Sequence, residues 1–160
     1  MNIEEITKGN QMCFDGIHPS FFLLGLMSAF DNRYQATADN FFEEISWKQF
    51  FAIICIDLCK EAPTIRELAE IMGSSHQNVK QILNKLEKKD YIRIEQDEND
   101  KRKQRIVLTE KTRAFCREHE KGSQAVVAKI FENTDPEDVA VTIKTIMQME
   151  KNLEKIGVKE

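Results

Sequence analysis

The sequence predicts a mainly α-helical fold with one small β-hairpin, and three observations support this prediction. The composition is that of a folded, helix-rich chain, with 41% hydrophobic and 31% charged residues but only three prolines and six glycines. Apolar residues recur with the helical period along most of the 160 residues. Two short segments instead alternate apolar and polar residues, as strands do. We expect one domain of ordinary size with additional helices.

The first two predicted helices have broad apolar faces. Residues 20–38 are predicted to form a helix, and Pro19 precedes it at a position where proline costs little. A second helix is expected to begin after its N-cap, Ser46, and to continue to about Leu58. Apolar residues surround too much of the first helix for it to lie alone on a surface. We therefore expect it to pack against a partner subunit as well as its own domain.

Residues 62–92 predict two short amphipathic helices joined by a tight turn. Thr64 and Glu67 have the spacing of a capping box, in which each side chain binds a backbone N–H at the helix start. Gly73 is expected to end this helix, and Ser74 or Ser75 to begin the next. The helical spacing predicts the buried positions Ile65, Leu68, Ala69 and Met72, followed by Val79, Ile82, Leu83 and Leu86. This is the pattern of a helix-turn-helix motif.

A β-hairpin is predicted directly after this motif. The segments "YIRIE" at 91–95 and "RIVLT" at 105–109 are its two expected strands. Between them lies most of "DENDKRKQRI", residues 97–106, in which seven of ten residues are charged. A helix-turn-helix followed by a hairpin forms a winged helix, and the charged stretch is then the tip of the wing.

The second helix of the motif presents a polar face that is suited to double-stranded DNA. Gln and Asn pair with adenine edges, while Lys donates to guanine or phosphate. No acidic residue lies between Glu70 and Glu87, although the chain has a net charge of −4. We therefore expect this helix to enter the major groove, the alternative being an ordinary solvated face. The expected DNA-facing residues are His76, Gln77, Asn78, Lys80, Gln81, Asn84 and Lys85.

Basic residues of the wing are expected to contact flanking phosphates or the minor groove. They are Lys101, Arg102, Lys103 and Arg105. The hydroxyls of Thr64, Ser74 and Ser75 are further candidate phosphate contacts. Asp100 is expected to hold Arg102 or Lys101 in place, because a carboxylate would be repelled by DNA. The alternative is that the stretch is a solvated loop.

The terminal helices have no obvious role inside a small winged helix, so we expect them to form a dimer interface. Thr109 is predicted to cap a long helix that ends near Phe131, and "TDPED" at 134–138 starts another. We divide the chain into an N-terminal leader and dimerisation helix (1–45), a winged helix-turn-helix DNA-binding domain (46–109) and C-terminal dimerisation helices (110–160).

Other classes of protein find little support in the sequence. No secretory signal, membrane span or disulfide framework is evident, so we expect a cytoplasmic location and reduced thiols. No phosphate-binding glycine loop and no nucleophile placed beside a base point to an enzyme. Cys116 and His119 have the spacing of two metal ligands but lack a third, and Cys55 and Cys59 are expected in the core. We expect no cofactor and no metal.

The sequence resembles the MarR (multiple antibiotic resistance regulator) family of winged-helix transcription factors over most of the chain, and most strongly from Ile45 to Thr109. The wing is similar to that family's Asp-x-x-Asp-Arg-Arg pattern followed by Leu-Thr, with Asp97, Asp100 and Arg102 in place. Lys101 stands where the first Arg is usual, and Lys lacks the planar fork of Arg.

The resemblance implies a homodimer that binds a pseudo-palindromic operator, usually as a repressor. It also implies a site for a small aromatic or lipophilic effector between the dimer helices and the DNA-binding lobe. Aromatic residues that are candidates for lining this site, or simply for the core, are Phe21, Phe22, Phe30, Trp47 and Phe51.

Two other functions stay open at this point. "NQMCF" at 10–14 is similar to the segment with the reactive cysteine in family members that sense organic peroxides, so Cys13 is a candidate redox switch. Alternatively, the net negative charge favours a winged helix that binds proteins and ignores operator DNA.

Overall fold

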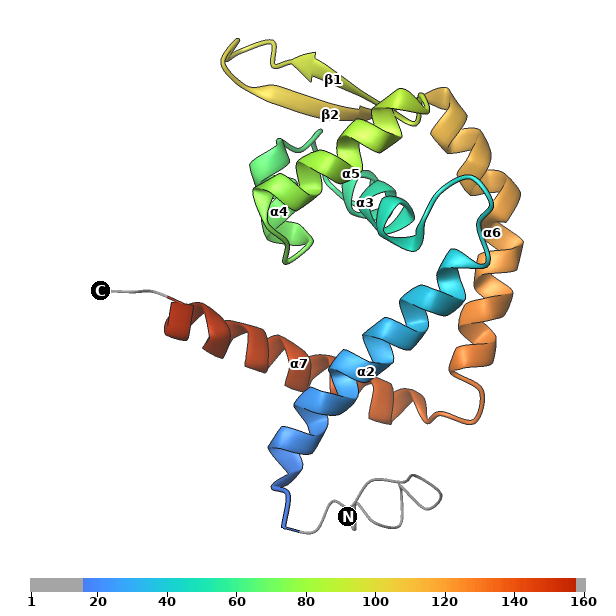
Figure 1. Cartoon of the computed structure of the whole chain (residues 1–160), viewed down its shortest axis with the longest axis vertical. Coiled ribbons are helices and arrows are strands. Elements are labelled where there is room, and N and C mark those ends of the chain that lie inside the picture. The colour runs from blue at the N-terminus through green and yellow to red at the C-terminus, as the bar shows by residue number, and fades with distance from the viewer. Residues whose placement is uncertain (1–15, 158–160) are drawn as a thin grey trace. The chain divides into compact units, whose positions relative to one another are not determined.

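Figure 1 shows the computed structural model of the chain, in which residues 16–157 are described. The chain divides into two compact units, Met1–Arg113 and Ala114–Glu160, and each is described by itself. The predicted mainly α-helical fold with a winged helix-turn-helix is confirmed. The described elements are α2 (Pro19–Asp39), α3 (Trp47–Asp57), α4 (Ile65–Ile71), α5 (His76–Lys88), β1 (Ile92–Gln96), β2 (Gln104–Leu108), α6 (Glu110–Ile130) and α7 (Pro136–Gly157).

The hydrophobic core of the first unit lies between α3, α4, α5 and the hairpin (Figure 1). On the inner face of α5, Val79, Leu83 and Leu86 have no exposed surface, and Ile82 is 8% exposed. This confirms the apolar face predicted for that helix. The other elements add the buried side chains Ala52, Ile53, Leu68, Tyr91, Ile92 and Ile106. Because burial of apolar surface is the main stabilising contribution to folding, this core determines which side of α5 faces solvent.

Side-chain caps begin three of these helices where the local sequence predicts them. Ser46 starts α3 in a capping box with Gln49. Thr64 and Glu67 form the second box: the Thr64 N–H donates to the Glu67 carboxylate at 2.7 Å, and the Glu67 N–H donates to the Thr64 hydroxyl at 3.3 Å. Ser75 is the N-cap of α5. Each cap satisfies a backbone N–H that the helix itself leaves without a partner.

The turn between α4 and α5 depends on Gly73. This residue has a φ of +58°, which glycine adopts more readily than any other residue. Its N–H donates to the Glu70 carbonyl at 3.2 Å, and the Ser74 N–H donates to the Ala69 carbonyl at 2.9 Å. These two bonds form a Schellman ending, which confirms the predicted C-cap and sets the angle at which α5 leaves α4.

The wing is an antiparallel hairpin attached to the helix-turn-helix. β1 and β2 pair from Ile92 opposite Leu108 to Gln96 opposite Gln104, so the two predicted strands are confirmed with bounds that differ by one residue. On the edge of β2 that faces away from β1, the Ile106 N–H donates to the Pro63 carbonyl at 2.9 Å. The loop before α4 therefore continues the sheet by one hydrogen bond.

Tyr91, at the start of the hairpin, is fully buried and has a partner for its hydroxyl. The hydroxyl donates to Glu44 Oε2 at 2.6 Å. The Lys111 ammonium lies 4.5 Å from the centre of the Tyr91 ring and 3.6 Å from Glu44 Oε2. The hydrogen bond from Tyr91 and the charge of Lys111 lower the pKa of the Glu44 carboxyl. These contacts connect the loop before α3 to the starts of β1 and α6.

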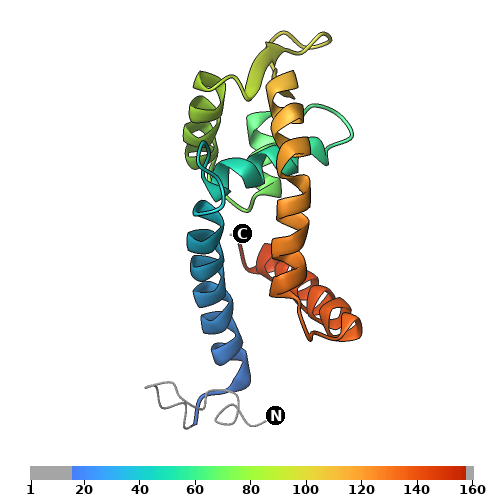
Figure 2. The same ribbon diagram turned by 90° about the vertical axis from the view of Figure 1, so that its right-hand side faces the viewer.

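The helix α2 exposes much of its apolar surface. Figures 1 and 2 show it extending as one long helix from the α3–α5 cluster, and none of its side chains is buried. Its exposed large apolar residues include Phe21, Leu24, Leu26 and Phe30. An isolated soluble subunit rarely leaves so many large apolar side chains in water.

The second unit contains most of α6 together with α7. Asp135 caps α7, since its Oδ1 accepts the Glu137 N–H at 2.8 Å, and Pro136 follows it in the first turn. No side chain of α7 is buried among its described residues. Its exposed large apolar residues are Val141, Ile143, Met147, Leu153 and Ile156. Within residues 16–157, no helix is both long enough and apolar enough to span a membrane.

Replacing Leu83 with Ala tests the core. Leu83 is 0% exposed, so we expect L83A to lower the free energy of unfolding by about 2–5 kcal/mol. Leu58, at the end of α3, is 79% exposed, and L58A should change it by less than about 0.5 kcal/mol. Urea denaturation followed by circular dichroism measures both values. Equal effects of the two substitutions would contradict the assigned core.

Candidate nucleic-acid interface

The outer face of α5 is a continuous polar surface. Every residue predicted to face DNA on this helix is exposed. Packing of Val79, Leu83 and Leu86 holds the helix in a single rotation, so the opposite face has to point outward. We call this surface the recognition face; it consists of His76, Gln77, Asn78, Lys80, Gln81, Asn84 and Lys85.

The start of this face is held by hydroxyl groups. The Ser75 hydroxyl accepts the Asn78 N–H at 3.2 Å, and the Ser74 hydroxyl accepts a hydrogen bond from the Asn78 side-chain amide at 2.9 Å. Thr64 uses its hydroxyl in the α4 capping box. These hydroxyls, which the sequence suggests as phosphate contacts, therefore already accept bonds that shape the helix starts. Each hydroxyl keeps its own proton to donate.

Arg105 has a different environment from the other basic residues of the wing. The charge pattern predicts a DNA contact for it, but its side chain is only 24% exposed and is engaged within the protein. Its Nε lies 2.6 Å from Asp97 Oδ2, and its Nη1 lies 3.0 Å from the Ala62 carbonyl and 3.4 Å from Glu67 Oε2. Arg105 thus joins the loop end of β2 to the loop before α4 and to α4 itself.

Asp97 shapes the tip of the wing. Its Oδ1 accepts the backbone N–H groups of Asn99 at 2.9 Å and Asp100 at 2.8 Å, while its Oδ2 binds Arg105. The hydrogen bond from Arg105, followed by those from the two backbone N–H groups, lowers the pKa of Asp97 from 3.8 to about 2. The sequence contains a signal for this role, because an Asp at the start of a turn commonly accepts the backbone N–H groups of residues that follow it in the turn.

The other basic residues of the wing tip face solvent. Lys101, Arg102 and Lys103 are exposed. The expected brace is confirmed, since Arg102 Nε lies 3.3 Å from Asp100 Oδ1. The Arg102 side chain remains 93% exposed, so an ion pair of this kind is weak and screened by salt. These three cations are available to an anionic partner.

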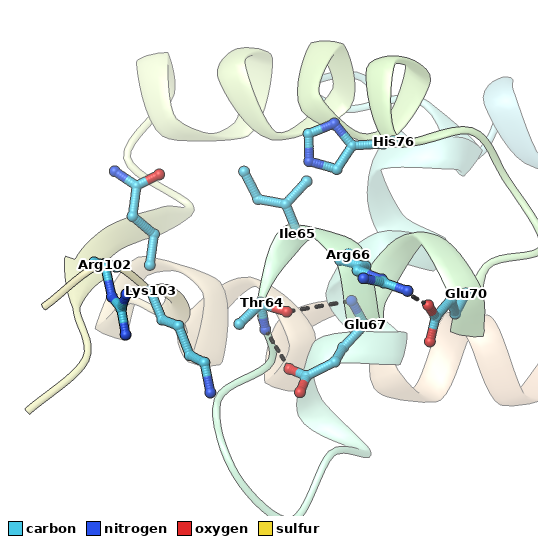
Figure 3. Close-up of a pocket in the computed structure, with 9 residues that line it drawn as sticks. Thr64, Ile65, Arg66, Glu67, Glu70, His76, Arg102 and Lys103 are labelled. Atoms are coloured by element: carbon cyan, nitrogen blue, oxygen red, sulfur yellow. Dashed lines mark hydrogen bonds and ion pairs between the residues drawn. The ribbon is translucent and has the colours of Figure 1, made fainter. Parts of the chain in front are cut away.

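An open groove of about 540 Å³ separates the wing from the start of α5 (Figure 3). Arg66 lies on its α4 wall with its Nε 3.2 Å from Glu70 Oε1. Arg66 was not among the residues predicted to contact DNA, although it follows the candidate phosphate contact Thr64 by only two positions. The residues that line this wing groove are Thr64, Ile65, Arg66, Glu67, Glu70, His76, Arg102, Lys103 and Gln104.

A second groove, of about 430 Å³, lies between α2, α3 and the start of α5. Two of the predicted effector residues, Trp47 and Phe51, line it, with their ring centres 6.0 Å apart. Tyr34 packs edge-on against Trp47 at 4.7 Å, and burial raises its pKa. The residues that line this aromatic groove are Asp31, Tyr34, Gln35, Trp47, Lys48, Phe51, Met72, Gly73, Ser74, Asn78 and Ile82.

The other three predicted effector residues lie outside the aromatic groove. Phe21, Phe22 and Phe30 belong to α2 and are not among the residues that line it. Phe21 is 74% exposed, and Phe30 is 54% exposed and stacks on Tyr34. Phe21 and Phe22 lie in the first half of α2 and Phe30 lies near its middle, whereas the residues of α2 that line the groove belong to its second half.

Two of the described thiols, Cys55 and Cys59, lie in surroundings that disfavour the reactive thiolate. Cys55 is buried, and burial raises the pKa of both Cys55 and Cys59. The Cys59 thiol donates to the Cys55 carbonyl at 3.1 Å. Cys13, the candidate redox residue, lies outside the described residues. Residues 16–157 contain no group of three or more His, Cys, Asp or Glu side chains placed to hold a metal ion.

Comparison with known proteins links this geometry to one family. The model of the MarR family matches residues 58–103, a segment that includes α4, the recognition face and most of the wing. No curated protein matches the sequence.

Solved structures have the same fold over most of the chain. A MarR/EmrR family transcriptional regulator from Acinetobacter sp. ADP1 is similar with a TM-score of 0.77 and 15% identity, covering 87% of this chain and 99% of that one. FabT of Streptococcus pneumoniae, solved in complex with DNA, has a TM-score of 0.62 and 26% identity, with coverage of 87% and 99%. BpsR of Bordetella bronchiseptica, whose DNA binding is regulated by 6-hydroxynicotinic acid, has a TM-score of 0.68 and 15% identity, with coverage of 80% and 98%.

The ion pair of Asp97 predicts a pH dependence of stability. Because its pKa falls from 3.8 to about 2 on folding, the stabilisation from this carboxylate is complete above about pH 4 and is lost as the pH falls through about 2. We expect D97N to be less stable than the parent at pH 7, with the difference shrinking between pH 4 and pH 2. Urea denaturation at a series of pH values measures it.

Asp57→Asn, which neutralises an exposed carboxylate at the end of α3, is the control for the loss of one charge. A difference between D97N and the parent that stays constant down to pH 2 would contradict the assigned role of the carboxylate.

Proposed function

Because this chain belongs to the MarR family of winged-helix proteins, we propose that it is a transcriptional repressor that binds a pseudo-palindromic operator in double-stranded DNA as a homodimer. The observation that supports this most strongly is the recognition face of α5. All seven of its side chains are exposed, and none of them is acidic. Among its members, Gln77 and Asn78 have the hydrogen-bonding groups that read adenine, and Lys80 those that read guanine or phosphate.

The wing supports the same proposal through charge. Lys101, Arg102 and Lys103 project from a hairpin that Arg105 and Asp97 hold against α4. In a duplex whose major groove contains α5, we expect these cations to contact phosphates or the adjacent minor groove. The residues from 60 to 113 carry thirteen Lys and Arg against ten Asp and Glu, whereas the rest of the chain carries ten against seventeen. The net negative charge of the chain therefore comes from residues outside 60–113, the segment that contains the recognition face and the wing.

We assign dimerisation to the terminal helices. α2 and α7 each leave a series of large apolar side chains exposed, and a second copy of the chain would remove them from water. In this proposal residues 1–45 and 110–160 form the dimer, and residues 46–109 bind DNA. Two recognition helices in a two-fold dimer then read half-sites about one helical turn apart, or about 34 Å.

We assign effector binding to the aromatic groove. Its walls include Trp47 and Phe51 from α3, together with Ser74 and Asn78 from the turn and the recognition helix. Flat aromatic walls with a few polar groups are typical of small-molecule sites. A ligand in this groove would contact the residues that orient the start of α5, which gives a direct route from ligand binding to DNA affinity.

Replacing Gln77 and Lys80 together with Ala tests the proposed function. We expect the double variant to remain dimeric but to lose about 1–3 kcal/mol of discrimination per base contact removed. Fluorescence anisotropy with DNA fragments flanking the protein's own gene, against random competitor duplex, measures the discrimination. Sedimentation of the same samples measures the oligomeric state.

A matched control replaces the exposed residues Gln124 and Lys129 of α6 with Ala, which removes the same two side-chain types outside the recognition face, and sedimentation checks that this control is still a dimer. Unchanged discrimination in the Gln77 and Lys80 variant would sink the assignment of α5. If the parent itself binds all duplexes equally, a protein-binding role is favoured instead.

The aromatic groove contains Trp47, the only tryptophan of the chain, so its occupancy can be followed directly. We expect benzoate to quench tryptophan fluorescence and to weaken operator binding over the same concentration range. Tyr34→Ala, on the groove wall, should weaken the quenching. Phe21→Ala changes an aromatic residue of the same helix outside the groove and should leave it unchanged. Equal effects of the two substitutions would contradict the assigned site.

A further inference from the structure

The wing groove lies between the two parts of the chain to which we assign DNA contacts. One wall is formed by His76 at the start of the recognition face, and the opposite wall by Arg102 and Lys103 of the wing. Figure 3 shows Arg66 and Glu70 on the α4 wall, on the side of the groove farther from Arg102 and Lys103, with Thr64 and Ile65 between. The groove is open to solvent and large enough, at about 540 Å³, for more than one water molecule or a phosphate group.

The geometry of duplex DNA places a sugar-phosphate strand at this groove. In B-DNA one strand always separates a major groove from the neighbouring minor groove. If α5 lies in the major groove and the wing reaches the adjacent minor groove, that strand has to pass between them. The wing groove lies between α5 and the wing, so the strand would pass along it.

The charges of the wing groove favour an anion, because its acidic residues are already paired. The Glu67 carboxylate accepts the Thr64 N–H and lies 3.4 Å from Arg105 Nη1. Those hydrogen bonds and the charges of Arg105 and Lys103 lower the pKa of Glu67. Glu70 is paired with Arg66 at 3.2 Å. Arg102, whose weak pair with Asp100 leaves it 93% exposed, and Lys103 then supply the cations that line the groove.

We propose that the wing groove binds one backbone phosphate of the bound DNA, and that Arg66 supplies the third cation by exchanging Glu70 for the phosphate. This inference rests on the proposed function. The Arg66 and Glu70 side chains are 86% and 67% exposed, so their pair is weak in water and exchanges at little cost. A guanidinium binds phosphate through two parallel N–H groups, which makes arginine better suited to this contact than lysine. Glu70 competes with DNA for Arg66 and therefore limits the affinity.

The test measures how DNA binding by the full chain depends on salt. The probe is the shortest flanking duplex that the parent protein binds, titrated by anisotropy between 50 mM and 200 mM KCl. Loss of one phosphate contact lowers the slope of log K against log salt by about 0.9. In the proposed homodimer R66A removes this contact from both subunits, so we expect the slope to flatten by about 1.8 and the deficit in affinity relative to the parent to shrink about twelvefold across the range. E70Q should bind more tightly than the parent at 50 mM KCl.

Arg113→Ala is the matched control. Arg113 pairs with Glu110 on α6 at 3.4 Å in an exposed contact of the same kind, but neither residue lines the wing groove. R113A should keep the parent slope. A parent slope in R66A, or no gain of affinity in E70Q, would overturn the role of Arg66.

A variant in which Lys101, Arg102 and Lys103 are all replaced by Ala separates this inference from the proposed function. If that variant flattens the slope while R66A does not, the wing binds DNA and only the assignment of Arg66 fails. If the parent shows no salt-dependent binding to any duplex, the proposed function fails together with the inference.

Discussion

The burial of one face of α5 determines the arrangement of the residues that we propose to face DNA. Val79, Leu83 and Leu86 lose all their exposed surface against α3, α4 and the hairpin. Rotating the helix would expose these side chains and bury polar groups without partners, and both changes are costly. The recognition face is thus held outward by the core rather than by contacts of its own, and it remains free to bind.

The position of the wing depends on contacts that cross the first unit. Arg105 connects Asp97 in the wing to Ala62 and Glu67, and the Ile106 N–H binds the Pro63 carbonyl. Because these contacts involve partly buried groups, they hold the hairpin at one distance from α4. The same contacts set the spacing between the wing and α4 that forms the wing groove.

Local chemistry explains which parts of the structure were predictable from the sequence. The capping box of Thr64 and Glu67, the turn at Gly73 and the apolar spacing of α5 all involve residues within a few positions of one another. The role of Arg105 was not predictable in this way, since Ala62 and Glu67 lie 43 and 38 residues away. The aromatic groove likewise depends on which half of α2 meets α3, so Trp47 and Phe51 line it whereas Phe21 does not.

The hydrogen bond between Ile106 and Pro63 has a consequence for how the hairpin behaves toward other molecules. A two-stranded sheet has two edges that can pair with strands of other chains and lead to aggregation. On one edge, Pro63 accepts the Ile106 N–H but has no N–H of its own, so this residue cannot extend the sheet further. On the other edge, β1 contains the charged residues Arg93 and Glu95, which disfavour pairing with a second hairpin. The wing can therefore project into solvent at high protein concentration without acting as a template for aggregation.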